Sequence, residues 1–173
     1  MNKFLIVIIA IPFLLLGCNN FITFSVMPDE EAVITQGEKI IRDTLGPGLH
    51  YKIPFFQTAH IIKKHRIRKC EFNSSSHKNT RAIVMWNVFD STKFFLFSRN
   101  KTEQEIENIL KSKTKEAMNP ISGSIINKIA LAQERNPQYT DKNSLIITAQ
   151  LQNSIKKLGI NIHLIVYQNE VEP

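Results

Sequence analysis

The segment Leu45–Gln57, with the sequence LGPGLHYKIPFFQ, constrains the fold more than any other stretch of the chain. Gly46, Pro47 and Gly48 predict a tight turn, because glycine adopts backbone angles that other residues avoid and proline favours turn positions. Large apolar and aromatic side chains follow the turn, and Pro54 ends them. Since proline in a sheet is confined to edges, we expect a turn that leads into a short edge strand.

Short alternating or β-branched stretches on both sides of this turn predict further strands. The expected strands cover residues 21–26, 32–36, 39–42, 49–53, 59–72, 81–90 and 160–168. The stretch 59–72 carries cations on both faces, so we expect either a strand with a bulge or a pair of strands. The apolar residues of the last strand are expected on one face, namely Ile160, Ile162, Leu164 and Val166.

The middle of the chain carries the helical signals. Ser91 or Thr92 is expected to cap a short helix through Phe97. Thr102 and Glu105 have the spacing of a capping box, which predicts a helix that runs to about Met118.

Two more helices are expected after this one, at residues 121–132 and in the stretch that Thr140 or Asp141 caps. The expected inner face of the last helix consists of Leu145, Thr148, Leu151, Ile155 and Leu158. Gly159 then stands where a helix ends in the left-handed conformation. Strands first, then helices, then a closing strand predict an α+β domain.

The N-terminus begins with an uncharged, apolar run at residues 4–17, after Lys3. The run is shorter than the about 20 residues that span a bilayer as a helix. It ends in LLGC, which resembles a bacterial lipobox, so Cys18 is a lipidation candidate. An uncleaved signal anchor and a lipoprotein signal both stay open for residues 1–26, with the domain at 27–173. Either one places that domain outside the inner membrane, in the periplasm of a Gram-negative cell.

Positive charge gathers between residues 60 and 81, in a chain with a formal net charge of +7. Each cation close to an anionic membrane surface contributes about 1 kcal/mol of attraction, and aromatic rings favour the interface. The membrane-surface candidates are Tyr51, Phe55, Phe56, Lys63, Lys64, Arg66, Arg68 and Lys69. A solvated strand face with the aromatic rings in the core is the alternative. Nucleic-acid binding conflicts with export and is not expected.

Signatures of catalysis are not found in the sequence. The histidines lack metal-ligand spacing, and no CxxC motif or glycine-rich phosphate loop occurs. Ser74–Ser76 lie near His77, but no nucleophile elbow surrounds them. We therefore expect no enzyme, catalytic residue, metal or cofactor. Cys70 is expected to be a half-buried strand residue.

Four segments carry a family resemblance in a fixed order. Residues 31–38, EAVITQGE, resemble an ERAVVTRFGK-type first hairpin, and residues 45–57 resemble a PGLHxKIPF signature. Residues 85–94, MWNVFDSTKF, look like a WRIxDPxKF segment, and the LGI at 158–160 looks like the start of an LGIEVxDVRIKxIxLP ending. Over roughly residues 21–173 the chain therefore resembles the band 7 family, also called SPFH for stomatin, prohibitin, flotillin and HflK/C, and within it the bacterial HflK/C branch.

The resemblance implies an α+β band 7 domain of antiparallel strands, helices and a closing strand, behind an N-terminal membrane segment. It also implies a non-catalytic scaffold at the bacterial inner membrane that assembles with an HflK-like protein, as a hetero-oligomer or a homo-oligomer. Such assemblies regulate the membrane AAA protease FtsH. The alternative is a stand-alone band 7 lipoprotein that binds the membrane surface or an envelope partner without forming a ring.

The chain departs from the family pattern at its C-terminal end. Family members usually continue past the last strand into a long helix rich in alanine and glutamate, which helps build a ring. This sequence stops at Glu172-Pro173, so the coiled-coil region is missing. We expect either a minimal family member or a truncated product.

Overall fold

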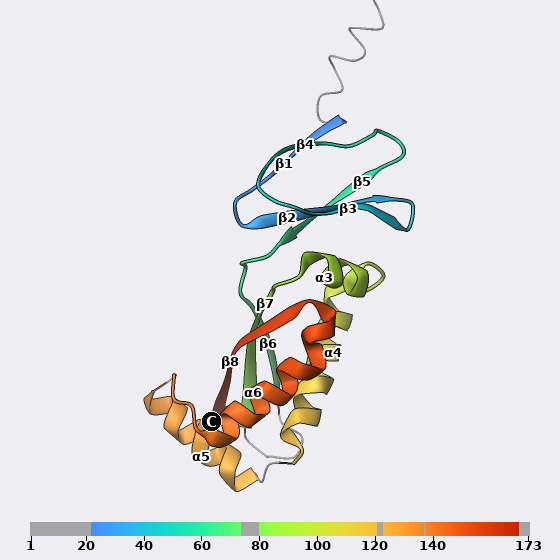
Figure 1. The fold of residues 1–173 in the computed structure, drawn as a ribbon. Coiled ribbons are helices and arrows are strands. Elements are labelled where there is room, and N and C mark those ends of the chain that lie inside the picture. Colours follow the sequence, from blue (N-terminus) through green and yellow to red (C-terminus); the bar gives the residue numbers. More distant parts are fainter. Residues whose placement is uncertain (1–21, 74–79, 121–122, 137, 170–173) are drawn as a thin grey trace, which may run out of the picture. The chain divides into compact units, whose positions relative to one another are not determined.

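The computed structural model describes residues 22–73, 80–120, 123–136 and 138–169 (Figure 1). The chain divides into two compact units, Met1–Lys63 and Lys64–Pro173. The apolar run at residues 4–17 and the candidate Cys18 lie outside the described residues. Within the described ranges, no helix has the length and apolar character needed to cross a bilayer.

The first unit is built from antiparallel strands. β1 (Thr23–Val26) pairs with β4 (Gly48–Tyr51) in a two-stranded sheet. β2 (Glu30–Gln36) lies in the middle of a second sheet, between β3 (Lys39–Leu45) and β5 (Thr58–Lys63). The central strand supplies most of the buried side chains, as expected for a strand that is paired on both sides.

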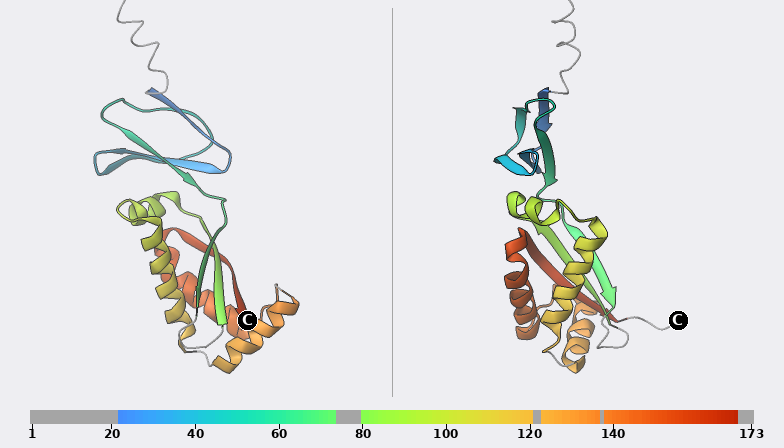
Figure 2. Two further views of the ribbon diagram at one scale, coloured as in Figure 1. Left: turned by 180° about the vertical axis from the view of Figure 1, so that it is seen from behind. Right: turned by 90° about the vertical axis from the view of Figure 1, so that its right-hand side faces the viewer.

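The second unit contains one antiparallel sheet in the order β6-β7-β8 (Figures 1 and 2). Its strands are β6 (Arg68–Asn73), β7 (Thr80–Val88) and β8 (Ile160–Asn169). The expected stretch 59–72 is therefore a pair of strands, and its two halves, β5 and β6, belong to different sheets.

Four helices connect β7 to β8 within the described residues. They are α3 (Ser91–Ser98), α4 (Glu103–Met118), α5 (Gly123–Arg135) and α6 (Lys142–Ile155), followed by a 3₁₀ turn at Lys156–Leu158. Strands, helices and a closing strand confirm the α+β class.

The helix starts follow local capping chemistry. Thr102 and Glu105 form the expected capping box of α4, and Asp141 caps α6 through the Ser144 amide. The prediction for α3 was one residue late, because the cap is Asp90, whose carboxylate accepts from the Lys93 amide at 2.9 Å. Aspartate serves as well as serine at this position, and Asp90 has the extended backbone that a cap requires.

The core of the second unit lies between one face of the sheet and the helices. Along β7, Val84, Trp86 and Val88 are buried, whereas the residues between them are partly exposed. The prediction for the inner face of α6 was partly wrong. Leu151 and Ile155 are buried, but Leu145 is 59% exposed and Ile147 takes its place. Both faces of this helix carry apolar residues near its start, so periodicity alone could not separate them.

The alternation predicted for β8 breaks at a register shift. β8 pairs regularly with β7 until the irregularity between Met85 and Trp86. Ile160 and Ile162 lie on the core face as expected, but beyond the shift Ile165 is the residue opposite the buried Val84. A bulge reverses the facing of every later residue, so Leu164 and Val166 fall on the other face, contrary to the prediction.

The outer edge of β8 is occupied by two glutamine side chains. The Gln152 amide of α6 donates to the Ile160 carbonyl at 3.1 Å and accepts from the Ile162 N–H at 2.8 Å. The Gln133 amide of α5 donates to the Ile165 carbonyl at 3.2 Å and accepts from the Tyr167 N–H at 2.7 Å. Each amide supplies the donor and acceptor that a neighbouring strand would supply. This edge of the sheet is thus closed.

Cys70 lies on β6 and is more buried than the sequence indicated. Only 1% of its surface is exposed, and its thiol is 3.8 Å from the Glu107 carbonyl of α4. Burial raises the pKa of the Cys70 thiol from 9.0 to about 11. The thiol is therefore neutral at physiological pH.

We expect Cys70 in a Cys18→Ser protein to react slowly with a thiol reagent at pH 8 until the chain unfolds. Its raised pKa lowers the thiolate fraction about 100-fold, and burial restricts access further. The time course of DTNB reaction, with and without denaturant, measures this. Equal rates in both conditions would contradict the packing of Cys70 under α4.

Candidate functional site

The strand β4 and the turn after it expose large apolar side chains in an unusual pattern. Leu49, Tyr51 and Ile53 recur at every second position and face solvent, whereas His50 between them is half-buried. The exposed fractions are 75% for Leu49, 65% for Tyr51, 52% for Ile53, 90% for Phe55 and 66% for Phe56. Strands of soluble proteins usually turn their apolar face inward. This patch of five residues, called the apolar loop below, is therefore a candidate binding surface.

The tip of the apolar loop is held by hydrogen bonds across the turn. The Gln57 amide N–H donates to the Ile53 carbonyl at 2.9 Å, and the Gln57 side chain accepts from the Ile53 N–H, also at 2.9 Å. Phe55 has a positive φ of 65°, a conformation that is costly for an aromatic residue. Backbone strain of this kind concentrates at functional sites, so the turn presents Phe55 and Phe56 at a backbone cost.

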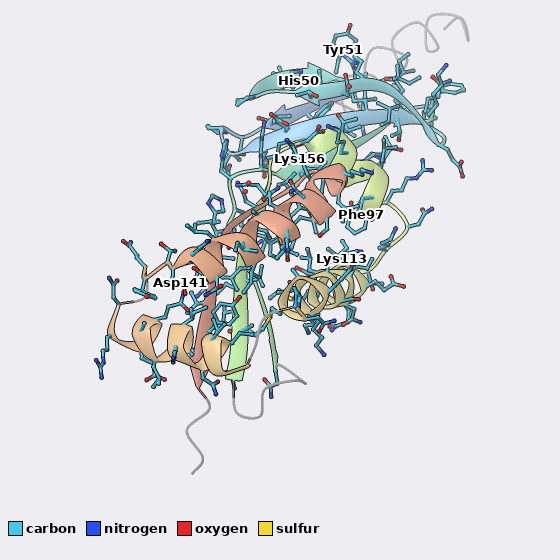
Figure 3. All side chains as sticks on the ribbon, turned by 60° about the horizontal axis from the view of Figure 1, so that its bottom comes forward. His50, Tyr51, Phe97, Lys113, Asp141 and Lys156 are labelled. Atoms are coloured by element: carbon cyan, nitrogen blue, oxygen red, sulfur yellow. The ribbon has the colours of Figure 1, made fainter. Side chains whose placement is uncertain are left out.

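Two side chains brace β4. The His50 Nε2 atom lies 2.7 Å from the Gly46 carbonyl oxygen and so ties β4 to the turn before it. Arg42 of β3 donates to the Tyr51 carbonyl, and its guanidinium carbon lies 4.6 Å from the centre of the Tyr51 ring. Figure 3 labels His50 and Tyr51 on this strand. Side-chain contacts from His50 and Arg42 thus hold the strand that carries the apolar loop, and the Arg42 cation lies beside Tyr51.

The apolar loop is paired with the segment that follows the apolar N-terminal run. Tyr51 pairs with Thr23, and the Lys52 N–H donates to the Ile22 carbonyl at 2.7 Å. Residue 17 ends the uncharged run, and five residues of extended chain reach at most about 18 Å. Ile22, which is bonded to Lys52, therefore lies within that distance of the end of the apolar run.

The cationic candidates are divided between the two units. Lys63 ends β5 in the first unit, and it is exposed. Lys64, Arg66 and Lys69 belong to the second unit, where Lys64 is half-buried and the other two are exposed. The structure therefore exposes Tyr51, Phe55 and Phe56 in one segment of the first unit but distributes the cations over two units.

Arg68 has a packing role in the second unit. Its guanidinium carbon lies 5.1 Å from the Trp86 ring centre and 5.9 Å from that of Phe94. Burial and the neighbouring Arg66 hold the pKa of Arg68 below its usual value. The guanidinium is still charged, and it stabilises the aromatic pair through cation–π contacts. Arg68 therefore contributes to the packing of the second unit, and it is not a purely surface cation.

His60 of β5 is the titratable group whose protonation opposes the fold of the first unit. Its Nε2 atom lies 3.1 Å from the Thr35 hydroxyl oxygen, and burial lowers the pKa of His60 below 6.5. The unfolded chain therefore takes up a proton at a higher pH than the folded one, so the stabilising contribution is present above pH 6.5 and is lost as the pH falls through the folded-state pKa.

We expect amide protection in β2 and β5 to decrease between pH 7 and pH 5 more in the natural protein than in His60→Gln. Glutamine keeps a hydrogen-bonding group for Thr35 but does not titrate. Hydrogen exchange, corrected for the intrinsic pH dependence of exchange, is the measurement. The same pH dependence in both proteins would remove His60 as its source.

Two exposed residues of this site were not among the candidates predicted from the sequence. Leu49 and Ile53 share the exposed face with Tyr51, and the alternation of residues 49–53 was a usable signal for them. The role of Arg42 could not be predicted from the sequence, because its contact with Tyr51 depends on how β3 lies beside β4. Within the described ranges no group of three or more His, Cys, Asp or Glu residues could hold a metal.

The chain has an antiparallel α+β fold with an exposed apolar loop, and its sequence is similar to those of known proteins. Residues 24–166 match the SPFH domain / Band 7 family, and the chain belongs to this family. Its members are membrane-associated and are generally non-catalytic scaffolds.

A curated relative is protein HflC of Buchnera aphidicola subsp. Schizaphis graminum, which is 26% identical to this chain. The similarity covers 94% of this chain and 59% of that protein. The chain thus spans about three-fifths of the length of the relative it matches.

Proposed function

We propose that this chain is a non-catalytic scaffold anchored in the bacterial inner membrane, with its domain, residues 27–173, on the outer side. In this proposal the apolar loop lies in the interface of the bilayer. The observation that carries it is the outward alternation of Leu49, Tyr51 and Ile53, followed by the exposed Phe55 and Phe56.

The energetics favour a bilayer over water for this surface. Moving one large apolar side chain from water into an apolar environment stabilises by about 1.5–3 kcal/mol when burial is complete. Five such side chains on a braced strand and turn retain a large gain even when each is only partly buried. Because Ile22 is tied to Lys52, an anchor in the N-terminal segment before β1 would hold the loop near the surface and lower the entropic cost of binding.

The partners of the scaffold are proposed from the relationship to HflC. An HflK-like protein is the expected assembly partner, and FtsH is the membrane protease that the assembly is expected to modulate. The 26% identity over 94% of the chain supports this assignment.

The assembly is tested by co-expressing the full chain with an HflK-like protein and FtsH. We expect the chain to migrate on blue-native gels in a complex that requires the HflK-like protein, and to change the rate at which FtsH degrades a membrane substrate. A chain that migrates alone in both cases, with an unchanged degradation rate, would refute the partnership.

The second candidate is a stand-alone band 7 lipoprotein, which the LLGC sequence at residues 15–18 favours. Labelling with a radioactive fatty acid tests it. Label that enters the natural chain and is lost in Cys18→Ser supports lipidation of Cys18. Membrane retention without label leaves the uncleaved anchor as the N-terminal arrangement.

A further inference from the structure

Arg42 is a cation held directly against the apolar loop. It lies on β3, donates a hydrogen bond to the Tyr51 carbonyl, and places its guanidinium carbon 4.6 Å from the centre of the Tyr51 ring. An unbound arginine side chain samples many rotamers, and restricting them costs free energy. Two contacts with the same residue of the loop offset this cost. The charge therefore has a defined position before any ligand binds.

The charge of Arg42 is not neutralised by the surrounding protein. Within the described ranges no Asp or Glu side chain forms an ion pair with it. Asp43 is the next residue on β3, and successive side chains of a strand point to opposite faces. The hydrogen bond to the Tyr51 carbonyl uses one of the guanidinium N–H groups. The other N–H groups remain available to an anion.

The net charge of the first unit does not give it a preference for anionic surfaces. Residues 1–63 contain as many Lys and Arg residues as Asp and Glu residues, so the net charge of +7 belongs to residues 64–173. A preference of the apolar loop for one kind of lipid must therefore arise from cations beside the loop. Lys52 alternates with the exposed side chains and is half-buried, whereas Arg42 lies on the ring of one of them.

We propose that Arg42 binds the phosphate group of an anionic phospholipid, so that the apolar loop prefers phosphatidylglycerol to phosphatidylcholine. Selection of a headgroup presupposes the membrane-bound loop of the proposed function and adds the class of lipid that the loop takes. Guanidinium N–H groups form paired, charge-assisted hydrogen bonds with phosphate oxygens. In phosphatidylcholine the choline cation already neutralises the phosphate, whereas phosphatidylglycerol keeps its net negative charge.

The position of Arg42 matches the depth at which lipid phosphates lie. Tyrosine rings favour the boundary between the hydrocarbon and the headgroups. Arginine extends its charged end toward the headgroups while its apolar stem covers apolar surface. With the apolar loop in the interface, the guanidinium beside the Tyr51 ring therefore lies among the headgroups.

A dissolved phosphate ion is a poor ligand for the same side chain. A single guanidinium near the surface binds a dissolved anion weakly, because both groups are well hydrated and the attraction is screened. A lipid that borders the loop instead presents its phosphate at a high effective concentration. Lipid phosphate is therefore the source that Arg42 selects.

Quenching by doxyl lipids measures this preference locally in the full chain. A Cys18→Ser, Phe55→Cys protein carries NBD at residue 55, in phosphatidylcholine nanodiscs that contain a small fraction of doxyl-labelled phosphatidylcholine or phosphatidylglycerol. The two quenching curves give the relative association of the two lipids with the loop. We expect phosphatidylglycerol to be preferred about fivefold, the factor that one cation contributes at an anionic surface. Dissolved inorganic phosphate, added at constant ionic strength, should leave the preference unchanged.

Substitutions on β3 assign the preference to Arg42. Arg42→Gln should remove most of it, and Arg42→Lys, which keeps the charge but lacks paired N–H groups, should retain a part. Lys39→Gln is the matched control, because it removes one exposed cation from the same strand, and it should keep the full preference. Hydrogen exchange in β2 and β5 verifies that each variant is folded.

The possible outcomes separate this proposal from the membrane contact on which it rests. Equal quenching by the two lipids with Arg42 present, or an unchanged preference in Arg42→Gln, would overturn the role of Arg42 and leave the membrane-bound loop intact. Loss of the preference in dissolved phosphate would indicate a general anion site and overturn the lipid assignment. Absence of quenching by either lipid would overturn the membrane contact and the headgroup binding together.

Discussion

Replacement of Gly159 by alanine is expected to destabilise the second unit by about 3 kcal/mol. Gly159 has a positive φ of 74°, and a Cβ atom there would lie 2.3 Å from the Asp90 carbonyl oxygen and 2.7 Å from the Phe94 nitrogen. Both obstacles are backbone atoms. They cannot move aside easily, because the Gly159 carbonyl accepts from the Phe89 N–H at 2.9 Å and the Asp90 N–H at 3.3 Å.

Urea unfolding followed by the fluorescence of Trp86 measures this loss, since Trp86 is the single tryptophan and lies in the second unit. Gly37→Ala is the control, because Gly37 also has a positive φ, of 58°, but a Cβ atom added there would meet no other atom within 4 Å. That change should cost the first unit only about 1 kcal/mol, measured by hydrogen exchange. Equal costs at both positions would mean that the close approach of Asp90 does not matter.

Replacement of Gln133 by leucine is expected to cost about 3 kcal/mol. The Gln133 side chain is 2% exposed and bonds three backbone groups: the carbonyls of Tyr139 and Ile165 and the N–H of Tyr167. Leucine has a similar volume but leaves these groups without their partner, and each unsatisfied buried group costs about 1–3 kcal/mol.

Gln150→Leu is the matched control for this prediction, because Gln150 lies exposed on α6. It should change the free energy of unfolding by less than about 0.5 kcal/mol. The Gln133→Leu protein should also aggregate more readily, since the outer edge of β8 is then open to other strands. A stability equal to that of the control would show that the glutamine does not close the edge.

The features of the fold that follow from local chemistry were predictable from the sequence. The capping box at Thr102 and Glu105 depends on neighbours within one turn, and the left-handed conformation of Gly159 depends on glycine itself. The same holds for the order of strands and helices, because hydrophobic spacing differs between them.

The features that depend on distant neighbours were not predictable. The bulge in β8 arises from its pairing with β7, and it reassigns Leu164 and Ile165 to opposite faces. The division of the cationic stretch between β5 and β6 depends on which strands join each sheet. At the candidate site Phe55 and Phe56 were anticipated as surface groups. Their positions on a braced turn, by contrast, depend on Gln57 accepting from the Ile53 N–H.

The contact between the apolar loop and the bilayer is tested most directly by a fluorophore placed at its tip. A Cys18→Ser, Phe55→Cys chain, labelled with NBD and reconstituted into nanodiscs, leaves the buried Cys70 unlabelled. Leu145→Cys, 59% exposed on α6, carries the control label. We predict blue-shifted NBD emission at residue 55, quenched by lipids with a doxyl group near the headgroup, and water-like, unquenched emission at residue 145. Water-like emission at residue 55 would contradict the membrane-bound loop.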